Sequence, residues 1–207
     1  MKNLAFVCSL VASSAVATAQ DSAVIGGSTS VALDTDLLET AAGLTLTGAA
    51  GTDGLVTLPG AVAFPITGGT DFAYTAGDFP GGPFSGAITH TGTVTFNTDT
   101  TVGDFTIGFD ASRATDGRSG FFVESTTGLE AIVFDTAVTG LASASEFKLD
   151  LSVDLLVSPE FAGVLGDNSL IGADVGDARI LAAVPEPTSI AAALVAALGV
   201  AGARRRR

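Results

Sequence analysis

Residues Phe147 to Val157, with the sequence FKLDLSVDLLV, decide the fold class of this chain. Apolar side chains occupy every second position, and most positions between them carry a charge or a hydroxyl group. A two-residue period predicts a β-strand with one buried and one solvated face. Weaker alternation predicts two more strands, Ala87 to Phe96 and Gly103 to Asp110. We therefore predict an all-β domain, either an antiparallel β-sandwich or a jelly-roll-like barrel.

Shorter apolar runs predict further strands at Leu44–Thr47, Leu55–Leu58, Gly120–Glu124, Ala131–Phe134 and Ala178–Ala183. Two short helices are expected. Ser158-Pro159-Glu160 combines a capping hydroxyl, a proline in the first turn and an acid, and it opens a helix that ends at Gly166. A second turn of helix is predicted over Asp34 to Ala42. Three prolines and six glycines between Phe64 and Gly86 predict a long surface loop.

The first nineteen residues have the three parts of a secretory signal peptide. Lys2 supplies the positive n-region, Leu4 to Val11 supply the apolar h-region, and Ala17-Thr18-Ala19 is a cleavage pattern of small residues. The mature protein is therefore expected to begin at Gln20. Cleavage removes Cys8, the single cysteine, so the mature domain must hold together without disulfides.

The C-terminal end has three parts in order: Val184-Pro185-Glu186-Pro187, an apolar stretch from Ile190 to Ala203, and Arg204, Arg205, Arg206 and Arg207. The prolines favour open, accessible backbone. The uncharged stretch predicts a transmembrane helix, and the arginines predict that its end stays in the cytoplasm. Fourteen residues span about 21 Å, short of a hydrocarbon core of ~30 Å, so this anchor is marginal.

These three parts resemble a PEP-CTERM sorting signal. The resemblance implies that an exosortase, a membrane protease-transpeptidase, cuts the chain near Pro185-Glu186-Pro187 after signal peptidase has removed the N-terminal segment. It implies an exported bacterial protein that is membrane-anchored transiently and then reaches the cell envelope surface or the extracellular matrix. An ordinary single-pass tail anchor is the alternative interpretation of the same residues.

Residues 20–183 then form one secreted β-rich domain with a strongly acidic composition. It holds twenty-one acidic and four basic residues, which gives a net charge of −17. Such a surface repels nucleic acid and anionic lipid. His90 is the only histidine, no cysteine remains to act as a nucleophile, and no phosphate-binding loop is present. We therefore predict no enzymatic activity and a structural or adhesive role, although two distant carboxylates could still converge.

An extracellular ligand-binding module is the alternative function, with three ligands to consider. Asp167, Asn168, Asp174 and Asp177 supply oxygen ligands in a glycine-containing loop, a chemistry that suits calcium. Solvated turn residues account for the same pattern. Extracellular polysaccharide is favoured by the destination, but the chain has one tyrosine and no tryptophan to stack on sugars.

Haem is the third ligand considered. The sequence from Phe64 through Ile88-Thr89-His90-Thr91-Gly92 resembles haem-transport surface domains of Gram-positive bacteria. Tyr74 and His90, the only tyrosine and histidine, lie on or near the segment Phe64 to Phe96, and side chains of these two types can ligate or cover haem iron. His90 shares a predicted strand face with Val94 and Phe96, so a hydrogen-bonded histidine in the core or at its rim is the alternative.

Overall fold

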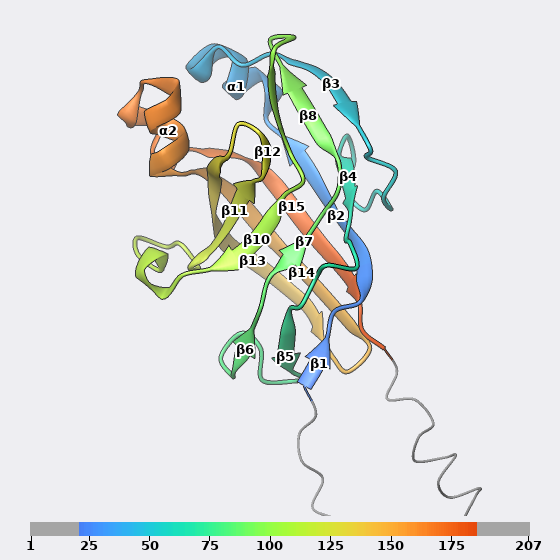
Figure 1. Cartoon of the computed structure of the whole chain (residues 1–207). Helices are drawn as coiled ribbons and strands as arrows, with labels where there is room; N and C mark the ends of the chain where they lie inside the picture. The colour runs from blue at the N-terminus through green and yellow to red at the C-terminus, as the bar shows by residue number, and fades with distance from the viewer. Residues whose placement is uncertain (1–20, 186–207) are drawn as a thin grey trace, which may run out of the picture.

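The computed structural model describes residues 21–185, which form a β-rich domain with two α-helices and two 3-10 turns (Figure 1). The strands are β1 Asp21–Ala23, β2 Gly26–Leu33, β3 Leu46–Ala50, β4 Val62–Pro65, β5 Ala73–Thr75, β6 Phe84–Ser85, β7 Ile88–Thr89, β8 Thr93–Phe96, β9 Thr100–Gly103, β10 Thr106–Phe109, β11 Phe121–Ser125, β12 Thr127–Gly128, β13 Ala131–Ala144, β14 Lys148–Val157 and β15 Asp174–Ala183. The predicted signal helix and the predicted membrane helix lie outside the described residues. Within residues 21–185, no helix has the length and apolarity needed to cross a membrane.

An eight-stranded antiparallel sheet, in the order β4-β2-β15-β14-β13-β11-β10-β7, is the frame of the domain. It curls until its two edge strands meet. Ile66, just after β4, forms an antiparallel bridge with His90, just after β7. The Thr67 amide donates to the Thr89 carbonyl over 2.8 Å, and the Thr91 amide donates to the Pro65 carbonyl over 3.1 Å. The predicted antiparallel β fold is thus observed, as a rolled sheet joined at one point.

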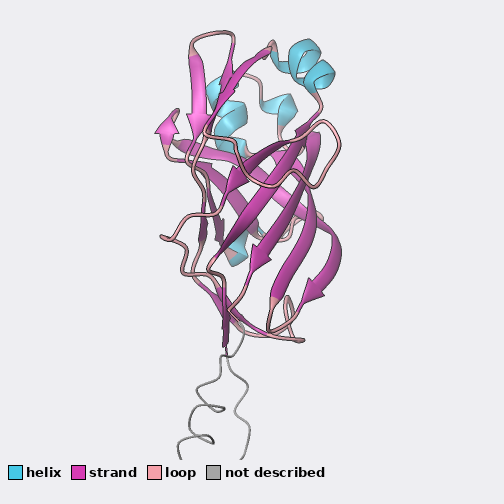
Figure 2. Ribbon diagram, turned by 90° about the vertical axis from the view of Figure 1, so that its right-hand side faces the viewer, coloured by secondary structure: helices cyan, strands magenta, loops and turns pink. Residues whose placement is uncertain are grey.

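Two smaller sheets lie at the ends of this roll. The sheet β12-β9-β8-β3 sends side chains into the same core, and the sheet β1-β5-β6 lies at the end from which both chain ends leave (Figure 1). Helix α1, Thr35–Ala42, and helix α2, Pro159–Leu165, lie at the opposite end (Figure 2). The two ends of the domain therefore differ, one carrying helices and the other the termini.

Both helix predictions are confirmed. The Asp34 carboxylate accepts the Leu37 amide at 2.9 Å and caps α1. Ser158 caps α2 by accepting the Phe161 amide at 2.9 Å, and Gly166 ends that helix in the left-handed conformation. The 3-10 turns are Ala111–Arg113 and Asn168–Leu170.

Two of the predicted strands are each divided between two sheets. Ala87 to Phe96 becomes β7 and β8, because the backbone turns at Gly92 with φ of +114°. A Cβ added to Gly92 would lie only 2.7 Å from the Gly51 carbonyl oxygen, so a side chain does not fit there. Gly103 to Asp110 becomes the end of β9 and all of β10, with Asp104 at φ of +45°. Alternation continues through these bends, so the pattern did not reveal them.

Other strand and loop predictions need correction. Leu55–Leu58 is not a strand: the Ser28 hydroxyl donates to the Leu55 carbonyl at 2.9 Å, so side chains of β2 satisfy this backbone. Phe64 to Gly86 is not one loop, because it contributes part of β4 and all of β5 and β6. Phe147 was expected to point inward, yet it precedes β14 in the hairpin tip and its side chain is exposed.

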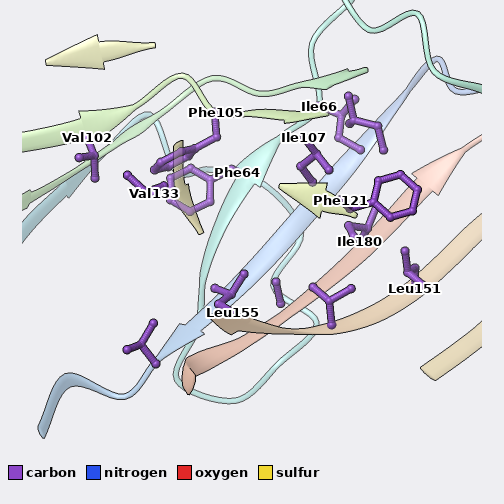
Figure 3. Packing of buried hydrophobic residues seen from close by; sticks show 14 of the residues in the cluster. Phe64, Ile66, Val102, Phe105, Ile107, Phe121, Val133, Leu151, Leu155 and Ile180 are labelled. Carbon is purple, nitrogen blue, oxygen red and sulfur yellow. The ribbon is translucent and has the colours of Figure 1, made fainter. Parts of the chain in front are cut away.

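The core fills the space between the rolled sheet and the smaller sheets (Figure 3). The predicted inward residues of β14 are buried, from Leu149 to Val157. Phe64 and Phe105 meet edge to face, with ring centroids 5.0 Å apart. A second aromatic cluster forms at the terminal end and consists of Phe72, Tyr74, Phe79, Phe84 and Phe121. These aromatic side chains explain why the glycine-rich segment before β7 is folded against the domain.

Candidate functional site

An apolar cavity of about 100 Å³ lies inside the rolled sheet. Its walls come from most strands of the large sheet and from β3, β8 and β9 of the four-stranded sheet, and they include Val31, Phe64, Phe96, Val102, Ile107 and Val153. Polar side chains reach it from Thr29, Thr35, Thr136 and His90. An apolar cavity with few polar groups is the usual chemistry of a small-molecule site, although this one is smaller than most.

His90 lies at the wall of this cavity, where the edges of the large sheet meet. Its side chain is buried, with 5% exposure. Nδ1 lies 3.1 Å from the Phe105 carbonyl oxygen, and Nε2 lies 2.8 Å from the Thr29 hydroxyl. A carbonyl only accepts, so Nδ1 carries the proton and the Thr29 hydroxyl donates to Nε2. Burial lowers the pKa of His90 to about 4, with the hydrogen bond to Phe105 opposing that shift.

Tyr74 lies in a different place, within the aromatic cluster at the terminal end. Its side chain is completely buried, and its hydroxyl donates to the Ser145 carbonyl over 2.7 Å. Burial raises the pKa of Tyr74. Tyr74 does not line the cavity that His90 borders. The structure therefore gives the two predicted haem ligands separate surroundings and hydrogen bonds to protein atoms.

The predicted calcium ligands also serve local structure. Asp167 accepts the amide and the hydroxyl of Ser169 at 2.9 and 2.6 Å, which caps the 3-10 turn that contains Asn168. Asp174 accepts the Gly176 amide at 3.2 Å. Across residues 21–185, no three histidine, cysteine or acidic side chains come close enough to hold a metal ion.

Asp177 meets a carboxylate that the sequence did not single out. It pairs with Asp154 across β14 and β15, and Asp174 lies near the same side chain. Burial is the largest cause of the raised pKa of Asp154, and repulsion from the Asp174 and Asp177 carboxylates raises this pKa further. Like charges opposed on neighbouring strands destabilise a sheet, so these three acids represent a local electrostatic cost.

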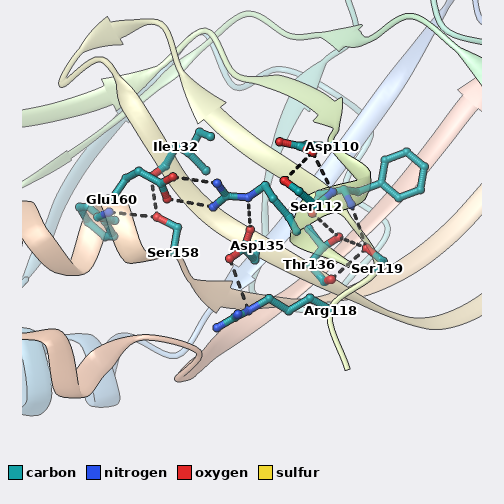
Figure 4. A network of polar contacts seen from close by, with 12 residues as sticks. Asp110, Ser112, Arg118, Ser119, Ile132, Asp135, Thr136, Ser158 and Glu160 are labelled. Atoms are coloured by element: carbon teal, nitrogen blue, oxygen red, sulfur yellow. Dashed lines mark hydrogen bonds and ion pairs between the residues drawn. The ribbon is translucent and has the colours of Figure 1, made fainter. Parts of the chain in front are cut away.

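An ion-pair network that the sequence did not predict joins α2 to the large sheet (Figure 4). Asp135 of β13 is buried, and the Arg113 Nε lies 2.6 Å from its Oδ1. Arg113 also makes two hydrogen bonds to Glu160, at 2.7 and 2.8 Å, which lower the pKa of Glu160 to about 2. Arg118 approaches the other Asp135 oxygen at 3.4 Å. The network fixes the loop between β10 and β11 against α2.

A second buried carboxylate, Asp150 of β14, binds the remaining two cations. Arg179 makes hydrogen bonds of 2.9 and 3.0 Å to its two oxygens, and Lys148 Nζ lies 2.8 Å away. The hydrogen bonds from Arg179, and then those from Lys148, lower the pKa of Asp150 to about 2 against the effect of burial. All four basic residues of the described domain are therefore engaged with acids. Their pairing depends on cross-strand positions that local sequence does not reveal.

The residues of the predicted sorting motif begin inside the folded domain. Val184 is buried, and its amide donates to the Phe147 carbonyl over 3.1 Å. Pro185 follows and is exposed. Glu186, Pro187 and the four terminal arginines lie outside the described residues. Val184, the first residue of the predicted motif, is thus held in the fold by burial and by one backbone hydrogen bond.

The observed fold and cavity define a class of protein: a β-rich domain whose rolled antiparallel sheet encloses an apolar interior. Among solved structures, the chain is similar to the C-terminal domain of HtaA from Corynebacterium glutamicum. The match has a TM-score of 0.49 and 14% sequence identity, and it covers 79% of this chain and 99% of that chain. Comparisons with protein families and with curated proteins gave no match.

Proposed function

We propose that this protein is an exported, non-catalytic surface or matrix domain, delivered by an N-terminal signal peptide and a C-terminal PEP-CTERM signal that exosortase removes. Its role is structural or adhesive. The sorting-signal residues support the destination. One structural observation supports the processing: β1 begins and β15 ends at the same end of the domain (Figure 1).

Both ends of the described chain are part of the folded domain. Asp21, the second residue of the expected mature protein, already pairs with Thr75 in the sheet β1-β5-β6. At the other end, Val184 is the last buried residue, and Pro185 is exposed. Cleavage before Gln20 and near Pro185-Glu186-Pro187 would therefore leave β1 and β15 in place in the exported domain.

We propose a non-catalytic role because the candidate general bases of the domain are buried and already paired. A general base needs an accessible lone pair within reach of its substrate. His90 is buried, and both of its ring nitrogens are hydrogen-bonded within the protein. The buried carboxylates Asp135 and Asp150 are already occupied by ion pairs, Asp135 with Arg113 and Asp150 with Arg179.

Intact-mass measurement of the protein from its native host tests the proposal. The expected product has lost Met1 to Ala19 and also the apolar stretch with Arg204 to Arg207. A variant with Pro185→Ala and Pro187→Ala is expected to keep its C-terminal end, whereas Pro59→Ala, in an exposed turn of the domain, is processed normally. Mature wild-type protein that retains the arginines would refute exosortase processing and favour a permanent tail anchor.

The cavity supports a second function, that of a binding module for a small apolar molecule. Its walls are mainly apolar, and a cavity of about 100 Å³ holds a few carbon atoms but not a porphyrin without opening. Dry apolar cavities of comparable size bind benzene or xenon in other proteins. Haem binding therefore requires a different surface or an opened sheet, and the absence of a Soret shift on adding haemin would exclude it.

Benzene is a suitable probe for this second function. At ten times its dissociation constant, a ligand that binds only the folded state adds about 1.4 kcal/mol to the free energy of unfolding. Ala178 lines the cavity, so Ala178→Val is expected to reduce the gain. Ala32 lies between cavity-lining residues of β2 and faces away, so Ala32→Val is the matched control. Equal gains in both variants would refute binding inside the cavity.

A further inference from the structure

Two exposed apolar side chains flank the place where the chain leaves the domain. The Ile25 amide donates to the Ala183 carbonyl at 3.0 Å on one side of β15. On the other side, the Val184 amide donates to the Phe147 carbonyl at 3.1 Å. Ile25 is 59% exposed and Phe147 is 53% exposed. The last residues of β15 therefore lie between two apolar side chains that face solvent, and we name Ile25 and Phe147 the apolar pair.

Hydrogen bonds in the hairpin tip between β13 and β14 keep the Phe147 side chain exposed. The Ser145 amide donates to the Lys148 carbonyl at 3.0 Å, and the Ser145 hydroxyl lies 3.3 Å from the Phe147 amide. From below, the buried Tyr74 hydroxyl donates to the Ser145 carbonyl over 2.7 Å. These hydrogen bonds fix the conformation of the tip, and the Phe147 side chain cannot turn into the core unless they break.

The sequence beyond the domain limits how far this end lies from a membrane. The apolar stretch begins at Ile190, five residues after Pro185. Five fully extended residues span at most about 18 Å. When the C-terminal stretch is in the bilayer, the end of the domain that carries the apolar pair is therefore held within about 18 Å of the membrane.

We propose that this end of the domain lies on the membrane in the tethered precursor, with Ile25 and Phe147 inserted into the interfacial region. The inference rests on the proposed function, because it requires the C-terminal stretch to enter the bilayer. Nearby charge selects the lipid: Asp21 and Glu146 are exposed, and Lys148 is paired with Asp150. The partner is therefore a zwitterionic bilayer surface, since anionic headgroups would be repelled. Contact would also hold Pro185 near the membrane plane, where a membrane protease acts.

The absence of tryptophan from the chain makes a direct test available. Full-length single-tryptophan variants Phe147→Trp and Ile25→Trp are reconstituted into phosphatidylcholine vesicles with and without brominated acyl chains. Val164→Trp is the matched control, because Val164 is 55% exposed on α2 at the opposite end of the domain. Vesicle flotation is measured on the same samples, and a urea unfolding curve checks that each variant is folded.

The expected result is flotation of all three variants, with a blue-shifted emission and strong loss of intensity by brominated lipid at positions 25 and 147 only. Flotation with equal, weak quenching at all three positions would refute membrane contact while leaving the anchor intact. Failure to float would refute the anchor itself and with it the proposed function. The two failures are therefore distinguishable in one experiment.

Discussion

The strongest prediction concerns acid and His90. The folded domain holds this histidine neutral with a pKa of about 4, whereas an unfolded chain has a histidine pKa near 6.5. Between these values the unfolded state binds more protons, so folding stability falls as pH falls. The contribution of His90 is fully present above about pH 6.5 and is lost on the way down to about pH 4. From pH 7 to pH 5 the loss amounts to about 2 kcal/mol, and complete protonation costs about 3 kcal/mol.

Urea unfolding at a series of pH values measures this effect. His90 is the only histidine, so a variant with His90→Gln removes this titration without leaving another histidine to obscure it. Acidic residues titrate in both proteins, and their contribution cancels in the difference. We expect the stability difference between wild type and variant to shrink by about 2 kcal/mol between pH 7 and pH 5. A difference that stays constant over this range would refute the assignment of a buried neutral histidine at the sheet closure.

Three further substitutions test other contacts in the same unfolding assay. Arg113→Met leaves buried Asp135 with only the longer contact to Arg118, and we expect a loss of about 2 to 4 kcal/mol. A smaller loss than in Arg118→Met would contradict the relative strengths of the two ion pairs. Tyr74→Phe leaves the Ser145 carbonyl without its donor and is expected to cost about 1 to 2 kcal/mol, so an unchanged midpoint would argue against that hydrogen bond. Gly27→Ala, at φ of +121°, forces a Cβ against the backbone of β15 and is expected to lower stability by more than about 2 kcal/mol, whereas a neutral result would contradict this strand pairing.

Local patterns in the sequence predicted the elements whose structure is decided locally. The alternation in FKLDLSVDLLV identified β14, and the Ser158-Pro159 signature identified α2 with its boundaries. Burial of one face and capping of a helix end depend on residues a few positions apart. Such features can therefore be predicted from the sequence without knowledge of the whole fold.

The site could not be predicted in the same way, because it depends on distant pairings. The Thr29 hydroxyl meets His90 across sixty-one positions, at the point where two sheet edges join. The Asp135 network similarly requires β13, α2 and the loop before β11 to come together. Predictions based on residue type alone gathered Asp167 and Asp177 into one site, yet the Asp167 carboxylate caps a 3-10 turn and Asp177 lies opposite Asp154 on the neighbouring strand.

The pairing of every cation within residues 21–185 has a consequence for how neighbouring copies of this domain interact. Four basic side chains use three of the twenty-one carboxylates in residues 21–185, which leaves eighteen without a cationic partner in that part of the chain. Two neighbouring copies of this domain therefore repel each other, because neither presents a positively charged area that could bind the acidic surface of the other. Dense arrays of this domain are expected to swell in dilute buffer and to compact when salt or divalent counter-ions shorten the range of repulsion.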